Sequence, residues 1–594
     1  MKRQTLLTTI TGGGTFAARR LPRIPALLST AALLATVSTA VADDHAEARF
    51  RGTGKADPIR IENVRRADGP AAAQSSITFD LAWDHSWRAA WDVAADRHGG
   101  TGTLKLESWD AAWVFVKFRK PGDDGYSHAM LSTVAADHSV PDGAALDVGP
   151  SDDGKRGVGV FVYRATAGSG ANHFKGVKLR WLHNADGVDA PGDVELKVLA
   201  IQMVYVPQCA FWLGDGSTTV VAGQFSAGDS ADPYRVESED AITLGGQSRK
   251  NLLNRDGIGM YLWPDDFTSG GTKTLPAQFP KGYAAFYCMR HEVTEGKYLE
   301  FLNTVGSERQ AGLAPIESRE GRPLTGIKIA VPGKPGTPAV YESDRPHVPC
   351  RCLISNDCAA YAAWAGLRPM TELEYEKACR GPLLPVPDEY AWGTAGIAGT
   401  SYHPWPTGRA FQEPAQSTGP RGYALQNART PEESIVWQGD HGPDASRGNA
   451  VWDGSILREG KDPRPFRSGA VSTPLLRAGV FATPESDRVA AGASYWGILE
   501  LSGSLWERVV TVGSWEGRRF ADTHGDWSEM VVEPKKRGGW GFGVRGGAIN
   551  SWTGSNEHNR LRTSDREMLV AATGMDQNRT MSMNVTFRCV RTAP

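Results

Sequence analysis

Seven cysteines are the side chains of this sequence with the widest chemical range: Cys209, Cys288, Cys350, Cys352, Cys358, Cys379 and Cys589. Thiolates can bind soft metals or form disulfides. The tightest group, Cys350-x-Cys352 followed by Cys358, matches no common zinc pattern, because paired zinc thiolates are usually separated by two residues or more. An odd count also leaves at least one thiol unpaired. The spacing therefore argues against a zinc cluster.

The N-terminal segment predicts export. Basic residues precede an apolar run, residues 24–41, that ends in the small-residue sequence Ala40-Val41-Ala42. This order is typical of a cleaved signal peptide over residues 1–42. A membrane anchor is the alternative, but Pro25 dilutes the run, and no later segment approaches the roughly 20 apolar residues that a span requires. We expect an exported protein (periplasmic, cell-surface or extracellular) with no membrane span after cleavage, in a compartment where disulfides persist.

Size and charge narrow the classes further. A chain of 594 residues exceeds one hydrophobic core, so we expect two folded domains after the leader. The 68 glycines and 36 prolines predict many turns and loops. The net charge is −2, and no run of five Lys or Arg with interleaved aromatics would suit phosphate contacts, which excludes nucleic acid as an expected partner.

Residues 55–203 have the pattern of an antiparallel β-sandwich. Short alternating runs are separated by Gly, Asp and Pro, namely Ser76–Trp83, Ala112–Phe118, Gly157–Arg164, Val177–Trp181 and Val194–Val206. Five tryptophans fall in the first half of this region: Trp83, Trp87, Trp91, Trp109 and Trp113. Flat rings can form a carbohydrate platform, but large aromatic side chains more often fill a core. We therefore expect these tryptophans in the core.

Residues 204–594 form the second predicted domain, and no linker separates it from the first. Helical spacing appears in Glu295–Thr304, Asp357–Ala365 and Thr371–Cys379, and Thr371-x-x-Glu374 is a capping-box pattern. After Gly381 the sequence is rich in Gly, Pro, Trp and Arg, with little periodicity. We expect an α+β domain with few helices, short strands and long loops.

A series of collinear blocks covers this second domain: Val204–Pro207, Glu292–Thr294, Trp364–Gly381, Gly497–Glu507, Val544–Gly547, Arg560–Arg562 and Phe587–Arg591. In this order the blocks resemble the formylglycine-generating-enzyme, or sulfatase-modifying-factor, family. The resemblance implies a C-type-lectin-like fold with two helices and abundant irregular loops. Glu507 and the arginines of the closing blocks are expected to be buried, paired and structural, because an isolated buried ion costs several kcal/mol.

The resemblance also implies a chemistry that this sequence lacks. The enzymes of this family oxidise a substrate cysteine with oxygen, using a copper ion held by two cysteines between the Arg-Gly-Gly and Arg-x-Arg blocks. Here that interval, Ala548–Asn559, contains no cysteine. Matching by hand places Ser551 or Thr553 at the first ligand position and His558 near the second. Hydroxyls are poor ligands for Cu(I), so we do not expect copper, and these three residues are only candidates for catalysis.

Other chemistry could use the same interval. Glu557 beside His558 could serve as a metal or acid–base pair. The iron-dependent relatives of this family carry a histidine-rich motif on a separate helical bundle, which this chain lacks. A groove that binds a ligand would be formed by five residues of the interval and the block that follows: Trp552, Asn556, Glu557, His558 and Arg562.

The resemblance predicts disulfides as well. The family can link a cysteine of its second helix to that of the closing Phe-Arg-Cys block. Here the matching helix position is Ala362, and Cys358 lies one helical turn earlier on a similar face, so we predict a bridge between Cys358 and Cys589. Cys379 matches another bridge position whose expected partner is Thr563, and it is expected to be free or differently paired.

A calcium ion is the remaining cofactor that the resemblance implies. Ser504 stands where the family has an asparagine ligand, which weakens the expected site. Asn449, Ser504 and Glu507 could still supply oxygen ligands, and backbone carbonyls often complete a calcium shell.

Three functions remain open from the sequence. The first is an exported, non-catalytic pseudoenzyme that binds an unknown protein, peptide or glycan ligand through loops around residues 551–559 and 571–583. Variable proteins of diversity-generating retroelements use this fold in the same way. The second is a diverged metal-dependent oxidoreductase acting on a peptide or sulfatase cysteine, or on another thiol. The third is a structural component of the cell envelope that docks through the β-sandwich.

Overall fold

The computed structural model describes most of the chain from residue 44 onward: residues 44–68, 75–217, 221, 223–255, 267–319, 321–397, 423–426, 434–437, 446–452, 475–524, 541–549, 560–568 and 579–594. Residues Asp43–Pro594 form one compact unit. Over the described ranges, no helix has the length and apolar character needed to cross a bilayer. The predicted signal segment and the interval 550–559 lie outside the described residues.

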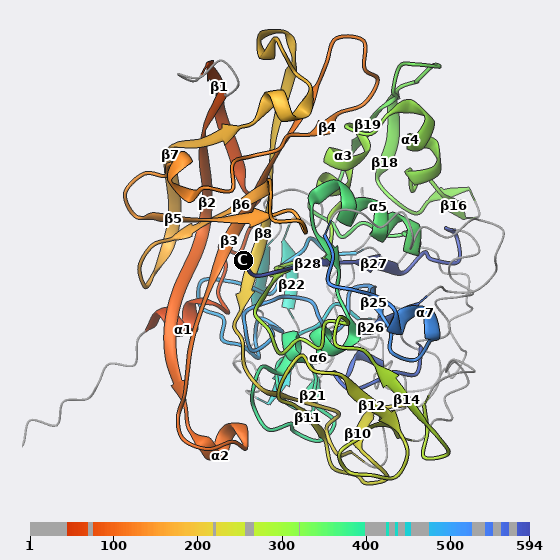
Figure 1. Ribbon diagram of the computed structural model, residues 1–594. Helices are drawn as coiled ribbons and strands as arrows, with labels where there is room; N and C mark the ends of the chain where they lie inside the picture. The colour runs from red at the N-terminus through yellow and green to blue at the C-terminus, as the bar shows by residue number, and fades with distance from the viewer. Residues whose placement is uncertain are drawn as a thin grey trace, which may run out of the picture. The chain divides into compact units, whose positions relative to one another are not determined.

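The largest sheet has eleven strands, and every neighbouring pair in it is antiparallel. Its main path runs β1-β2-β3-β8-β15-β28-β20, with β4 and β6 beside β3, β5 beside β6 and β7 beside β2. Figure 1 shows the long strands β2 and β3 side by side. The strands are β1 (Arg60–Asp68), β2 (Ser75–Val93), β3 (Leu104–Arg119), β4 (Ser127–His128), β5 (Ala144–Pro150), β6 (Gly157–Arg164), β7 (Gly168–Trp181), β8 (Glu195–Val206), β15 (Phe286–Met289), β20 (Arg368–Pro369) and β28 (Cys589–Thr592).

The N-terminal part of this sheet surrounds a hydrophobic cluster. Alternate residues of β2, from Ile77 to Trp83, are at most 1% exposed, and they meet inward-facing residues of β3, β6 and β7. The period-two pattern of the sequence therefore predicted both the strands and their buried face. Four of the five tryptophans, at positions 83, 87, 109 and 113, are buried, and the fifth, Trp91, is half-buried and donates a hydrogen bond to the Tyr495 hydroxyl. Their expected place in the core is confirmed.

Strand β8 joins the N-terminal region to the rest of the chain. One edge of β8 pairs with β3 from Asp110 to Arg119, and the other edge pairs with β15. The predicted boundary at residues 203 and 204 lies inside this strand. The two regions therefore share one hydrogen-bonded sheet, a closer connection than the abutting domains that the missing linker suggested.

The three predicted helices are present. They are α3 (Glu295–Leu302), α5 (Ser355–Ala365) and α6 (Glu372–Arg380). The capping box of α6 also forms: the backbone N–H of Glu374 donates to Thr371 Oγ1 at 3.2 Å, and the N–H of Thr371 donates to a Glu374 carboxylate oxygen at 2.9 Å. Asp357 caps α5 in the same way, accepting from the N–H of Ile354 at 2.8 Å. Local sequence chemistry thus defines where these helices begin.

The remaining elements are short. Further helices are α1 (Asp44–Ala48), α2 (Ala95–His98), α4 (Ser307–Leu313) and α7 (Trp515–Arg518). The small sheets comprise β9 (Phe211–Leu213) with β11 (Tyr234–Val236); β10 (Phe225–Ala227), β13 (Leu252–Asn254), β12 (Ile242–Gly245) and β14 (Thr272–Leu275); β16 (Ser318–Arg319) with β17 (Arg322–Pro323); β18 (Ile327–Val331) with β19 (Val340–Ser343); β21 (Gly396–Ile397) with β24 (Arg447–Gly448); β22 (Tyr423–Gln426) with β23 (Ser434–Trp437); and β26 (Phe542–Arg545), β25 (Trp506–Val510) and β27 (Val585–Phe587). This agrees with the predicted α+β class with many loops. The finer prediction of a C-type-lectin-like arrangement stays a prediction.

Candidate functional site

The segment that the resemblance singled out begins where β26 ends. Arg545 is the last residue of this strand, and Gly546 and Gly547 follow with φ of 87° and 71°. A Cβ at Gly546 would lie 2.8 Å from the Leu501 carbonyl oxygen, and one at Gly547 would lie 2.7 Å from the Leu561 side chain. Only glycine accommodates this backbone without strain. The Arg-Gly-Gly block is thus a sharp exit from the sheet into the candidate loop.

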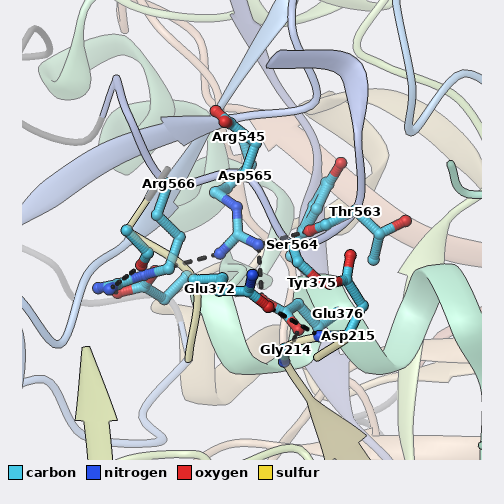
Figure 2. Close-up of polar contacts among 12 residues, drawn as sticks. Gly214, Asp215, Glu372, Tyr375, Glu376, Arg545, Thr563, Ser564, Asp565 and Arg566 are labelled. Carbon is cyan, nitrogen blue, oxygen red and sulfur yellow. Dashed lines mark hydrogen bonds and ion pairs between the residues drawn. The ribbon is translucent and has the colours of Figure 1, made fainter. Parts of the chain in front are cut away.

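A buried ionic network holds the base of this exit in place (Figure 2). Arg545 donates to Glu372 at 3.2 Å and to Glu376 at 2.7 Å, and all three side chains are 0% exposed. Glu372 also pairs with Arg566, with Nε to Oε2 at 2.8 Å, and Glu376 pairs with Arg380 at 2.6 Å. Glu372 and Glu376 lie one helical turn apart on α6, so one helix face binds Arg380 of the same helix and two arginines from elsewhere in the chain, Arg545 and Arg566.

The network sets the charge state of its carboxylates. Burial alone raises the pKa of Glu372, but the guanidiniums of Arg566 and Arg545 outweigh that effect and lower its pKa. Arg545 also donates to the carbonyl oxygen of Thr563 at 2.6 Å, which ties β26 to the block beyond the candidate loop. Both ends of the loop are therefore attached to α6.

The predicted burial and pairing is confirmed for Glu507 and Arg588 of the remaining family charges, whereas Arg560 is partly exposed and pairs with Glu567. Glu507 and Arg588 form a bidentate pair in which the guanidinium is 0% exposed and the carboxylate 1% exposed. Burial, followed by the charges of Glu500 and Glu507, raises the pKa of Glu292 well above its usual range. These groups lie inside the protein and support the fold.

The residues proposed for calcium are engaged in contacts of the protein itself. Ser504 Oγ donates to Glu292 at 2.9 Å, both carboxylate oxygens of Glu507 accept from Arg588, and Asn449 Nδ2 donates to the Ala490 carbonyl at 2.8 Å. Over the described residues, no group of three or more His, Cys, Asp or Glu side chains is arranged to hold a metal ion. The calcium site stays a prediction, and these contacts leave few of its oxygens unoccupied.

All seven cysteines lie in the described part of the chain, and all are buried free thiols. Burial raises the pKa of Cys352 and of Cys379 to about 12, and it also raises the pKa of Cys209, Cys288 and Cys350. A thiol is a copper ligand only as its thiolate, and a buried neutral thiol is inert. None of the seven lies between the Arg-Gly-Gly and Arg-x-Arg blocks, so the cysteines present do not fit the copper site of the family.

Cys358 on α5 and Cys589 on β28 lie close together, as the predicted bridge requires. Burial and the adjoining Cys358 thiol raise the pKa of Cys589 well above its usual range. Both side chains are 0% exposed and belong to the same hydrophobic cluster. The structure has both as thiols, so the disulfide itself stays a prediction.

The candidates of the loop lie outside the described residues: Ser551, Trp552, Thr553, Asn556, Glu557 and His558. Arg562 is described and is only 7% exposed. Its guanidinium donates to the carbonyl oxygen of Asp388 and lies 4.8 Å from the ring centroid of Tyr390. Arg562 therefore contacts the chain that follows α6, and its predicted role in a ligand groove stays a prediction.

The ion pairs of α6 were not anticipated pair by pair. The available signal was the spacing of Glu372 and Glu376, which places two carboxylates on one helix face, together with an excess of arginines in the closing blocks. That pattern indicated buried charges, but it could not tell which arginine meets which glutamate.

Comparisons with known proteins agree with this geometry. Residues 259–593, more than half of the chain, match the sulfatase-modifying factor enzyme 1-like domain. A formylglycine-generating enzyme from Thermomonospora curvata is 44% identical over 69 residues, a stretch that covers 11% of this chain and 22% of that relative. The aligned stretch thus spans about a fifth of the relative's length. Because the domain match covers more than half of the chain and the Arg-Gly-Gly exit is in place, the chain belongs to the sulfatase-modifying factor (formylglycine-generating-enzyme-like) family.

Proposed function

We propose that the protein is an exported, non-catalytic member of this family that binds a protein, peptide or glycan ligand. The proposed binding surface is the loop that leaves the sheet at Gly546 and Gly547, together with residues 571–583. Asn, Ser, Thr, Gly and Met, which form adaptable contacts, are frequent in both segments. The ionic network of α6 would hold the two ends of the loop in place, so that residues within the loop could differ without disturbing the fold.

One observation carries this proposal. The interval between Gly547 and Arg560 contains no cysteine, and every cysteine of the chain is a buried thiol elsewhere. A two-thiolate copper site would need at least two of these cysteines to leave hydrophobic clusters and ionise, against pKa values that burial has raised. The scaffold of the family is therefore present without its oxidising centre.

A copper competition experiment tests the proposal. The purified full chain is titrated with Cu(I) against a coloured chelator, and oxygen consumption is followed with a cysteine-containing peptide. We expect no copper retained and no oxygen consumed. The matched positive control is the double variant Thr553→Cys/His558→Cys, which returns a thiolate to both positions and should gain Cu(I) binding.

The opposite result is equally clear. Stoichiometric copper or iron in the unaltered protein that disappears in His558→Ala, together with oxygen uptake, would replace this proposal with a diverged metal-dependent oxidoreductase. For the ligand itself, a glycan array and a peptide library probed with the protein and with Trp552→Ala should give signals that depend on the loop. Equal signals from both proteins would place binding elsewhere.

A further inference from the structure

A small pocket lies away from the candidate loop, beside the N-terminal end of α3. It has a volume of about 90 Å3 and is lined on one side by Ile59, Ile201 and Met289. Since one water molecule occupies about 30 Å3 of liquid, this is room for about three water molecules or for a small organic ligand of comparable volume. Its apolar wall comes from β8, β15 and the chain before β1, all of which are rigid parts of the sheet.

The two carboxyl groups in the pocket wall are already used as acceptors. The oxygens of Asp57 accept from the backbone N–H groups of Asp84 and His85, each at 2.8 Å. Those of Glu292 accept from Ser504 Oγ at 2.9 Å and from the N–H of Leu505 at 3.1 Å. Each of the two carboxyl groups therefore already accepts two hydrogen bonds from the protein.

Hydrogen-bond donors, in contrast, remain available on the polar side of the pocket. His291, His347, Thr294 and Lys297 all line the pocket. Thr294 Oγ1 accepts from the N–H of Lys297 at 3.3 Å as the cap of α3, which leaves its own O–H to donate. Among the described residues, neither imidazole donates to a protein acceptor. The Lys297 ammonium pairs with Glu300 at 2.8 Å and keeps a third N–H.

His291 shows this excess most clearly. Its Nδ1 is buried without a hydrogen bond and lies 3.6 Å from Glu500 Oε2, which is also unsatisfied. Glu500 has a φ of 63°, a conformation that costs a non-glycine residue energy and that proteins keep mainly at functional sites. A partly exposed imidazole whose Nδ1 is buried beside a strained carboxylate, on the wall of an open pocket, is an arrangement that a ligand could complete.

We infer that this pocket binds a small carboxylate with a short aliphatic tail, in the size range of propionate. The carboxylate would supply the acceptors that Thr294, Lys297 and the imidazoles lack, at the N-terminal end of a helix where negative charge is favoured. The tail would lie against Ile59 and Ile201. This site is separate from the loop of the proposed function, and the result of its test does not depend on that function.

Titration of the full chain with 13C-labelled propionate, followed by NMR and calorimetry, tests the inference. We expect saturable binding, with propionamide, the neutral isostere, binding at least about tenfold more weakly because it loses the charge-assisted hydrogen bonds. Lys297→Met and His347→Gln should each weaken propionate binding by a similar factor. Both side chains are only half-buried, so both variants should fold, which the melting temperature checks.

Two matched controls accompany these variants. Lys328→Met removes another lysine from an ion pair, with Glu342 at 3.1 Å on the β18–β19 hairpin, and His173→Gln removes an exposed imidazole on β7. Neither residue lines the pocket, and both variants should bind propionate as the parent does. The inference is overturned if propionate does not saturate, if propionamide binds equally well, or if the pocket variants and the controls behave alike.

Discussion

Lys117 should make the free energy of unfolding of this protein change with pH between about 7 and 10.5. The residue lies on β3, is 4% exposed and donates to the carbonyl oxygen of Trp364 at 2.5 Å and to His128 Nδ1 at 3.1 Å. Within the described structure no carboxylate lies within ion-pair distance of it. Burial alone lowers the pKa of Lys117 from 10.5 to about 7. We therefore use Lys117→Met to measure the cost of an unpaired buried ammonium.

The sign follows from proton binding. Between pH 7 and pH 10.5 the unfolded state keeps the Lys117 proton while the folded state has released it, so stability rises with pH across that window. With the folded pKa near 7, the contribution of Lys117 increases by about 2 kcal/mol between pH 7 and pH 9. In Lys117→Met this increase is absent. The difference between the parent and the variant should therefore change by the same amount.

The assay is urea unfolding followed by tryptophan fluorescence, at intervals of half a pH unit. Burial, and after it the charge of Lys117, lowers the pKa of the neighbouring His128 to about 3, so this imidazole is neutral above pH 7 and the pH slope of the difference in that range reports Lys117. The two lost hydrogen bonds shift the difference by a constant. Lys105, on the same strand and with an 82% exposed side chain, provides the matched control: its ammonium is solvated in both states, and Lys105→Met should give a flat difference. A flat difference for Lys117→Met would refute the reasoning.

Three further predictions concern the network, the cysteines and the N-terminal segment. Arg545→Met removes one of the two arginine partners from each of the buried carboxylates Glu372 and Glu376 and should lower the free energy of unfolding by about 3–5 kcal/mol. Arg60→Met, at a partly exposed ion pair, should cost at most about 1 kcal/mol, and equal effects in chemical unfolding would contradict the assignment. Peptide mapping without reduction, on protein from an oxidising compartment, should recover Cys358 linked to Cys589; alkylation of both before reduction would exclude the bridge. Arg49 anchors the chain after α1, because its guanidinium carbon lies 4.2 Å from the Phe50 ring centroid and 4.4 Å from that of Trp91. Arg49→Met should therefore make this segment more sensitive to limited proteolysis, and unchanged cleavage would refute that role.

Local patterns predicted most of the elements but not the way they join. Alternation predicted β2, β3, β6, β7 and β8, and capping chemistry predicted the start of α6, because both signals depend on residues close in sequence. Strands β15 and β28 have only four residues each, which is too short for a periodic signal. The sharing of β8 between two regions could not be foreseen, because strand pairing depends on contacts distant in sequence.

The candidate site, like the fold, could be predicted from the sequence only in part. The absence of cysteine between the Arg-Gly-Gly and Arg-x-Arg blocks could be read directly from the sequence, because it concerns residue types within a short interval. The burial of Glu507 was implied by the family resemblance, and its pairing followed because an isolated buried ion would be costly. The pocket beside α3 could not be foreseen, since His291 and His347 are distant in sequence and carry no motif. Lys117 escaped notice because an inward-facing lysine in a strand looks like any other polar residue.

The strand that serves both regions also decides how this chain can be divided. A protein that begins at residue 204 would keep only Val204, Tyr205 and Val206 of β8, three of the four residues that pair with β15, and would lose all of β3. The remnant of β8 would become an open sheet edge, a surface that templates aggregation. Truncations meant to isolate the enzyme-like region should therefore retain the N-terminal strands. Any transfer of this module between proteins, by recombination or by design, has to move the sheet as a whole.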